Sequence, residues 1–220
     1  MKERSKETKK MVITAMFTAI IVAMAFVPYM GYIPLGFMNA TIIHIPVIIG
    51  AVLLGPKTGA FLGAVFGLTS MINNTFNPNL TSFVFSPFYS VGDTHGNFAS
   101  VIVCMVPRIL IGVVAYYVYK GILKLLKNLK GKSVVALAAA GLAGSMTNTV
   151  LVMGGIYFLF GNSYAAAKGL AIDALHGLIM GVIGTQGVPE AIVAAIIVTA
   201  VCKVMMTAFK GEFTVQAATR

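Results

Sequence analysis

Residues 98–119 read FASVIVCMVPRILIGVVAYYVY, an apolar run that contains one charged residue, Arg108. A helix that crosses the hydrocarbon core of a bilayer needs about 20 apolar residues, so this stretch predicts a membrane-spanning helix. The composition of the whole chain agrees, because 58% of its 220 residues are hydrophobic and 10% are charged. A soluble domain carries about 25% charged residues. We therefore expect an integral membrane protein.

Five further apolar segments lie on either side of residues 98–119. Together, the six segments predict an all-α bundle of six transmembrane helices over residues 11–206, with short tails at 1–10 and 207–220. The other predicted spans cover residues 11–27, 41–54, 60–72, 134–160 and 189–206. The predicted outer loops cover 28–39, 73–96 and 161–187, and the predicted inner loops cover 55–59 and 120–133. We expect residues 161–187 to form a partly helical outer lid, because a further span there would place Asp173 and His176 in hydrocarbon.

The basic residues predict the orientation of the bundle. They gather at both ends of the chain and in the inner loops: Lys2, Arg4, Lys6, Lys9, Lys10, Lys57, Lys120, Lys124, Lys127, Lys130, Lys132, Lys203, Lys210 and Arg220. Short loops rich in Lys and Arg stay on the cytoplasmic side, so we expect both termini there. The net charge of +10 does not indicate nucleic-acid binding, because these charges lie at the membrane edges, next to lipid headgroups. Arg108 and Lys168 are the two basic residues outside this pattern.

The sequence carries none of the motifs that would indicate an enzyme. It has no nucleophile elbow, no HExxH and no paired carboxylates within a span, and residues 55–59 lack the spacing of a phosphate-binding loop. Cys104 and Cys202 fall in apolar segments near opposite membrane faces, which predicts neither a disulfide nor a metal site. We expect no cofactor, no metal and no ATPase site. Any uphill transport must therefore draw its energy from elsewhere.

Arg108 is the sharpest candidate for a functional side chain. An Arg near the centre of a span costs about 2.5–3.5 kcal/mol even on the lenient insertion scale, so other interactions must offset that cost. One interpretation is a guanidinium aimed into a cavity, where it binds a carboxylate. The other is a structural clamp onto helix-end carbonyls or onto Glu190. Pro107 frees a carbonyl one turn earlier, which suits both interpretations equally.

Other polar residues near the predicted outer side are weaker candidates for substrate binding. They are Asn148, Asn39, His44 and Asn73. Each has a structural alternative, since amides in membranes commonly form hydrogen bonds between helices and a single His is often a core residue. Glu190 follows Pro189 at the predicted start of a helix, where an acid is favourable for local reasons. We therefore favour a helix-start role for Glu190 over a role in substrate contact.

Ala15, Ala19 and Ala23 recur every fourth residue along the first span. Small residues at this spacing form a smooth strip that lets another helix approach closely. The strip predicts a surface for helix packing, either inside the bundle or with a partner protein.

Taken together, these features resemble the substrate-binding S components of bacterial energy-coupling factor (ECF) vitamin transporters. The resemblance covers nearly the whole chain and includes the six short spans and the Ala15–Ala19 strip behind a basic tail. The motifs that carry it are Ile43-His44-Ile45-Pro46, Leu54-Gly55-Pro56-Lys57-Thr58-Gly59-Ala60 with Gly63 and Gly67, Ser82-Phe83-Val84-Phe85-Ser86-Pro87, Pro107-Arg108-Ile109, Thr147-Asn148-Thr149 and Val188-Pro189-Glu190-Ala191-Ile192-Val193. Within the family, the chain most resembles the S components that bind pantothenate.

The resemblance implies a function and partners. It implies a subunit in the bacterial cell membrane that binds a vitamin from outside and delivers it through a transmembrane coupling subunit with two cytoplasmic ATPases. It also implies that Ala15, Ala19 and Ala23 face the coupling subunit. Pantothenate has one carboxylate, which Arg108 could bind, and an amide and two hydroxyls, which Asn148, Asn39, Asn73 or His44 could bind.

Three alternatives remain open from the sequence. An S component for a pyridoxine-type or thiamin-type vitamin is the nearest, although a cationic ligand disfavours contact with Arg108. A stand-alone secondary carrier is a second alternative, which the lack of a deep acid and the small size disfavour. A membrane enzyme or a scaffold is the third.

Overall fold

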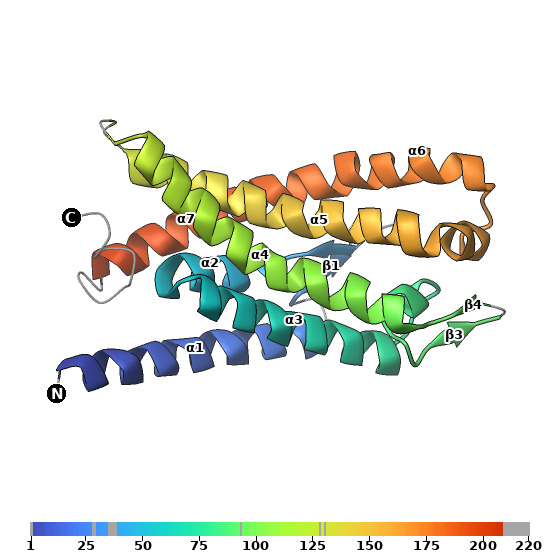
Figure 1. Ribbon diagram of the computed structural model, residues 1–220, viewed down its shortest axis with the longest axis horizontal. Helices are drawn as coiled ribbons and strands as arrows, with labels where there is room; N and C mark the ends of the chain where they lie inside the picture. Colours follow the sequence, from blue (N-terminus) through green and yellow to red (C-terminus); the bar gives the residue numbers. More distant parts are fainter. Residues whose placement is uncertain are drawn as a thin grey trace.

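Helices make up most of the computed structural model (Figure 1). The structure describes residues 2–27, 30–34, 39–92, 94–127, 129 and 131–208, with the side chains of all except 2–5 and 32–40. The helices are α1 (Lys2–Phe26), α2 (His44–Leu54), α3 (Pro56–Phe76), α4 (Phe98–Leu125), α5 (Lys132–Ala167), α6 (Ile172–Val182) and α7 (Val188–Ala208), with a 3-10 helix η1 (Ser82–Val84) and a π-helix η2 (Ile183–Gly187). Two antiparallel hairpins pair β1 (Tyr32–Pro34) with β2 (Asn39–Thr41) and β3 (Ser90–Val91) with β4 (Thr94–His95).

The helix inventory confirms the predicted all-α class. The segments α6, η2 and α7 are continuous, so the described residues form six helices. Four helical stretches are long and apolar enough to cross a membrane: Lys6–Phe26, Phe98–Leu125, Lys132–Ala167 and Ile172–Ala208. The apolar helix α2 has 11 residues, which is about 16 Å at 1.5 Å per residue and about half of a hydrocarbon core. The chain is thus a multi-pass membrane protein with two short hairpins that the hydrophobic pattern does not predict.

Several helices extend past the predicted spans. The α3 helix runs to Phe76, and in its last turns Asn74 Nδ2 donates to Ser70 O (2.9 Å) and Thr75 Oγ1 donates to Met71 O (2.8 Å). These polar side chains thus find partners within the helix that they extend. The region 161–187 is also helical except at 168–171, and α6 lies alongside α5 (Figure 1).

Local sequence signals explain where the helices begin. Gly55 has φ +101° between α2 and α3, and Pro56 follows it in the first turn of α3, so the chain reverses in a single residue. The α4 helix begins with a capping box, in which the Asn97 side chain accepts from Ala99 N–H (2.8 Å) and Ser100 Oγ accepts from Asn97 N–H (3.0 Å). These signals fix the starts of the two helices that form one side of the bundle.

Glycines let α3 and α4 approach closely beside Arg108. A Cβ at Gly112 would lie 2.5 Å from the carbonyl carbon of Gly59, and a Cβ at Gly63 would clash with the carbonyl oxygen of Arg108. Neither contact could be relieved by moving a flexible side chain, because both partners are backbone atoms. The close approach therefore fixes the backbone that carries Arg108.

We expect Gly63→Ala to destabilise the protein by about 1–3 kcal/mol, the usual cost of overpacking a close contact. Thermal unfolding of the purified protein in detergent would measure the loss as a lower Tm. The matched control is Gly154→Ala, since a Cβ there meets no atom within 4 Å. Equal Tm values for the two variants would contradict the close-packing account.

Two hydrophobic clusters build the interior. One joins α1, α2, α3, α4 and α5 through Ile21, Ile48, Leu62, Ile111 and Leu137. The other joins η1, α4, α5 and α6 through Phe83, Val103, Ile156, Phe160 and Leu175. The start of α1 and the end of α7 lie at one end of the bundle, and the β3–β4 hairpin and the α5–α6 connection lie at the other (Figure 1). A cavity lies where residues of both clusters meet, and it is lined by Phe66 of the first and Val152 and Ile156 of the second.

Candidate functional site

The cavity has a volume of about 600 Å³ and draws its lining from most of the bundle. This volume suits a small molecule, since ligand pockets range from about 300 to 1,000 Å³. Its polar and charged lining residues are Thr41, Ser70, Asn74, Asn79, Thr81, Arg108, Asn148, Thr149, Tyr164, Lys168, Gln186 and Glu190. Helices α3, α4, α5, α6 and α7 all contribute to the wall, so the cavity exists only in the folded bundle.

Arg108 reaches this cavity from α4 and is held by its own helix. Pro107 has no N–H to give to the carbonyl of Val103, four residues earlier, and Arg108 Nη1 donates to that oxygen instead (2.7 Å). The guanidinium carbon lies 5.1 Å from the ring centroid of Phe85 and 5.6 Å from that of Phe66, within the range of cation–π attraction. The carbonyl clamp suggested by Pro107 is therefore present, and two aromatic rings support the charge.

The clamp uses one N–H donor of the guanidinium, at Nη1. Arg108 Nε is buried and has no hydrogen-bond partner in the described part of the chain. Arg108 and Glu190 both line the cavity, yet no ion pair joins them among the residues that the structure describes. A planar group with five N–H donors is thus anchored by one of them beside an open cavity.

Asn148 lines the cavity from α5, as do Thr149 and Tyr164 of the same helix. Its neighbours Thr147 and Thr149 direct their hydroxyls to Ala143 O (2.6 Å) and Ser145 O (3.4 Å) of the same helix. Asn148 Oδ1 is buried and has no partner in the described residues. The structure thus brings Arg108 and Asn148, two of the predicted candidates, to one cavity.

Two other predicted candidates, His44 and Asn73, do not line the cavity. His44 is 1% exposed in the core. Asn73 Oδ1 accepts from Asn77 Nδ2 (3.0 Å), and its neighbour Asn74 lines the cavity instead. Consecutive residues of a helix point about 100° apart, so Asn73 and Asn74 face different directions. The sequence alone does not show which of the two faces the cavity. The side chain of Asn39 lies outside the described residues.

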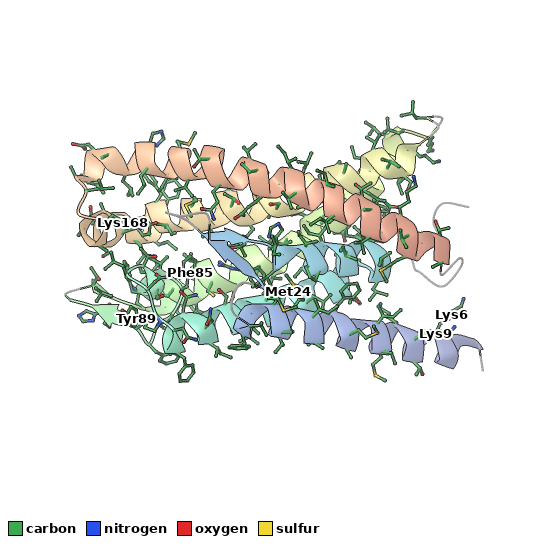
Figure 2. The ribbon with its side chains drawn as sticks, turned by 180° about the vertical axis from the view of Figure 1, so that it is seen from behind. Lys6, Lys9, Met24, Phe85, Tyr89 and Lys168 are labelled. Atoms are coloured by element: carbon green, nitrogen blue, oxygen red, sulfur yellow. The ribbon has the colours of Figure 1, made fainter. Side chains whose placement is uncertain are left out.

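A hydrogen-bonded loop after α3 covers part of the cavity. Ser82 Oγ donates to Asn74 Oδ1 (2.8 Å) and accepts from Asn79 N–H (2.9 Å), and the hydroxyls of Thr75 and Ser86 lie 2.7 Å apart. These bonds hold the loop against α3 and bring Phe85 over the guanidinium of Arg108. Figure 2 shows Phe85 and Lys168 towards the end of the bundle that carries the β3–β4 hairpin. Lys168, which the charge pattern leaves unexplained, also lines the cavity.

Glu190 lies on the α7 side of the cavity and is 8% exposed. Its Oε1 accepts from the backbone N–H of Thr41 (2.7 Å) and from Gln186 Nε2 (3.0 Å). It does not mark a free helix start, because α7 continues from η2. Pro189 gives no N–H to the carbonyl of Thr185, and Val188 N–H bonds to Ile183 O, five residues back. The proline therefore produces a π-bulge inside a continuous helix.

A separate groove runs along α1. It has a volume of about 930 Å³, and its lining includes Ala15, Ala19 and Ala23 together with Phe61 of α3. All three alanines are exposed, and the hydroxyls of Thr14 and Thr18, which also line it, bond to backbone oxygens of α1. The predicted strip is thus an open, mainly apolar surface on this chain.

Comparison with known proteins gives the family. Residues 9–202 match the family model described as "ECF transporter, substrate-specific component". A protein named pantothenic acid transporter PanT from Lactococcus lactis subsp. cremoris is 38% identical over 165 residues, which is 74% of this chain and 76% of that protein. A pantothenate transporter PanT from Leuconostoc mesenteroides subsp. mesenteroides is 30% identical over 207 residues, covering 92% of this chain and 94% of that protein.

These matches confirm the resemblance inferred from the motifs, and they confirm a transporter subunit in place of an enzyme. A cavity inside a membrane bundle, lined by an anchored Arg and by an Asn whose Oδ1 has no partner among the described residues, is consistent with substrate binding. The chain therefore belongs to the family of substrate-specific components of ECF transporters.

Proposed function

We propose that this substrate-specific component binds pantothenate from the outer side of a bacterial cell membrane. The observation that carries the proposal is the cavity that contains both Arg108, with its unpartnered Nε, and Asn148, with its unpartnered Oδ1. Two relatives that are named as pantothenate transporters support the same ligand.

The chemistry of pantothenate matches these two residues. Its carboxylate suits the guanidinium of Arg108, which offers a charge-assisted hydrogen bond in a water-poor site. Its amide N–H suits the Oδ1 of Asn148. A thiamin-type cation would face two cations, Arg108 and Lys168, and one acid, Glu190, among the described lining residues, so the charge balance disfavours it. Asn73 and His44 do not line the cavity, so we leave them out of the proposed site.

We further propose that both termini lie in the cytoplasm. The lysine-rich segments support this orientation by the positive-inside rule. The placement of the α1 start and the α7 end at one end of the bundle agrees with it (Figure 1).

We propose that the groove along α1 docks the transmembrane coupling subunit, which two cytoplasmic ATPases drive. The exposed alanines at positions 15, 19 and 23 support this, because a smooth apolar strip allows close helix packing in a membrane. The chain itself shows no ATPase motif. Transport then divides between a binding cavity on this chain and a motor on its partners.

The test of the proposed ligand is mass spectrometry of small molecules that co-purify with the isolated protein. The protein should be purified without added vitamin from cells grown in rich medium. Pantothenate in stoichiometric amount is the expected result. Release of a pyridoxine-type or thiamin-type compound would assign the chain to another vitamin. Uptake of pantothenate into vesicles that lack any ATPase partner would instead indicate a stand-alone carrier.

We expect Asn148→Ala to weaken pantothenate binding about tenfold, the usual effect of losing one hydrogen bond of about 1–1.5 kcal/mol. Titration calorimetry of the purified protein would measure the change. Asn162→Ala is the matched control, since Asn162 is an exposed amide on the same helix outside the cavity. An unchanged Kd for Asn148→Ala would remove Asn148 from the site.

A further inference from the structure

The cavity carries opposite charges on helices that lie on two sides of α5. Arg108 comes from α4 and Glu190 comes from α7, and both of these helices pack against α5. Asn148 of α5 lines the cavity with them. No ion pair joins Arg108 to Glu190 in the described chain, so the two charges do not neutralise each other directly. The arrangement fits a ligand with an anionic group at one end and hydrogen-bond donors at the other.

The two oxygens of the Glu190 carboxylate have different surroundings. Oε1 accepts from Thr41 N–H (2.7 Å) and Gln186 Nε2 (3.0 Å), and this fixes the plane of the carboxylate. Within the described residues, Oε2 accepts no hydrogen bond, although Glu190 lines the cavity. A carboxylate that is more than nine-tenths buried loses much of its hydration, so a donor from a bound ligand would be favourable.

We propose that Glu190 is a specificity-determining residue whose Oε2 accepts hydrogen bonds from the hydroxyl groups of the ligand. This inference rests on the proposed function and adds an orientation to it. The carboxylate of pantothenate lies at Arg108, its amide at Asn148 and its diol at Glu190. The site then selects anions that carry hydroxyls at the end remote from the carboxylate.

The test combines one substitution with one change in the ligand. Titration calorimetry of the full chain in detergent would compare pantothenate with its analogue that lacks one hydroxyl, in the parent and in Glu190→Gln. In the parent, removal of the hydroxyl that Glu190 binds should weaken binding about 10- to 100-fold, because a hydrogen bond to a charged group is lost. In Glu190→Gln the same removal should cost less than about fivefold, because only a neutral hydrogen bond is lost. Pantothenate has two hydroxyls, so there are two analogues that each lack one of them. Each analogue is measured separately, and the hydroxyl whose removal weakens binding to the parent more is the one assigned to Glu190.

A structural role would give a different pattern. If Glu190 only held the Thr41 backbone, Glu190→Gln would weaken pantothenate and both analogues by the same factor, and that outcome would overturn the proposal. Parent protein that binds both deoxy analogues within twofold of pantothenate would also overturn it, with no variant needed. Glu7→Gln, an acid on the exposed α1 groove, should leave every Kd unchanged. A parent that binds neither pantothenate nor its analogues would instead refute the proposed function, together with the orientation built on it.

Discussion

Substitution of Arg108 by Met is expected to weaken pantothenate binding by about 30-fold or more, because truncating one partner of a buried charge pair costs about 2–5 kcal/mol. Met keeps the length and the apolar character of the side chain, so the rings of Phe66 and Phe85 retain a packing partner. The carboxylate of the ligand would then be buried without a counter-charge. Titration calorimetry with the purified protein measures this loss directly.

Two controls separate charge recognition from damage to the fold. Lys168 is the other cation in the described cavity lining, and it is exposed. Lys168→Met should therefore weaken pantothenate binding much less than Arg108→Met does. Pantothenol, in which an alcohol replaces the carboxylate, should bind the parent poorly and should lose little further affinity in Arg108→Met. If Arg108→Met bound pantothenate as tightly as the parent, Arg108 would not contact the ligand, and its role would be limited to the hydrogen bond with Val103 O.

Substitution of Ala19 by Trp is expected to abolish ATP-driven transport while leaving pantothenate affinity unchanged. Ala19 is exposed in the groove beside Phe61, and the described linings of the groove and of the cavity share no residue. A large side chain there fills the groove and prevents a partner helix from approaching closely. Transport by the complete transporter in vesicles and co-purification of the coupling subunit would both fall at least about tenfold, since even about 1.4 kcal/mol of lost contact has that effect.

Ala200→Trp is the matched control, because it places the same side chain at an exposed position of α7 outside the groove. It should assemble and transport like the parent. If Ala19→Trp lost pantothenate binding and kept its partners, the groove would not be the docking surface.

The sequence is sufficient for the features that depend on composition and spacing. The apolar segments predict an all-α membrane protein, and the position of Arg108 deep within an apolar segment marks it as unusual. Asn148 is predicted as a polar residue in a span, and the structure places it in the same cavity as Arg108. The alanine strip follows from a four-residue spacing, which fixes one face of a helix in any context.

Other features depend on contacts between distant segments, which a single sequence does not reveal. Phe66 and Phe85 support the guanidinium from α3 and from a loop, and apolar residues are too common to signal such a role. The position of Glu190 after Pro189 indicates a helix start, whereas its hydrogen bond to Thr41 joins residues 149 positions apart. The π-bulge that makes α6 and α7 continuous arises from a shift of the backbone ladder, which hydropathy does not report.

Titration calorimetry of pantothenate into the isolated, purified protein tests the central claim most directly. The account predicts saturable binding of one pantothenate per chain with no coupling subunit or ATP present. It also predicts that pantothenol, pyridoxine and thiamin bind at least about 30-fold more weakly, since each lacks the carboxylate partner of Arg108. An absence of binding to pantothenate, or equal binding of pantothenate and pantothenol, would contradict the account.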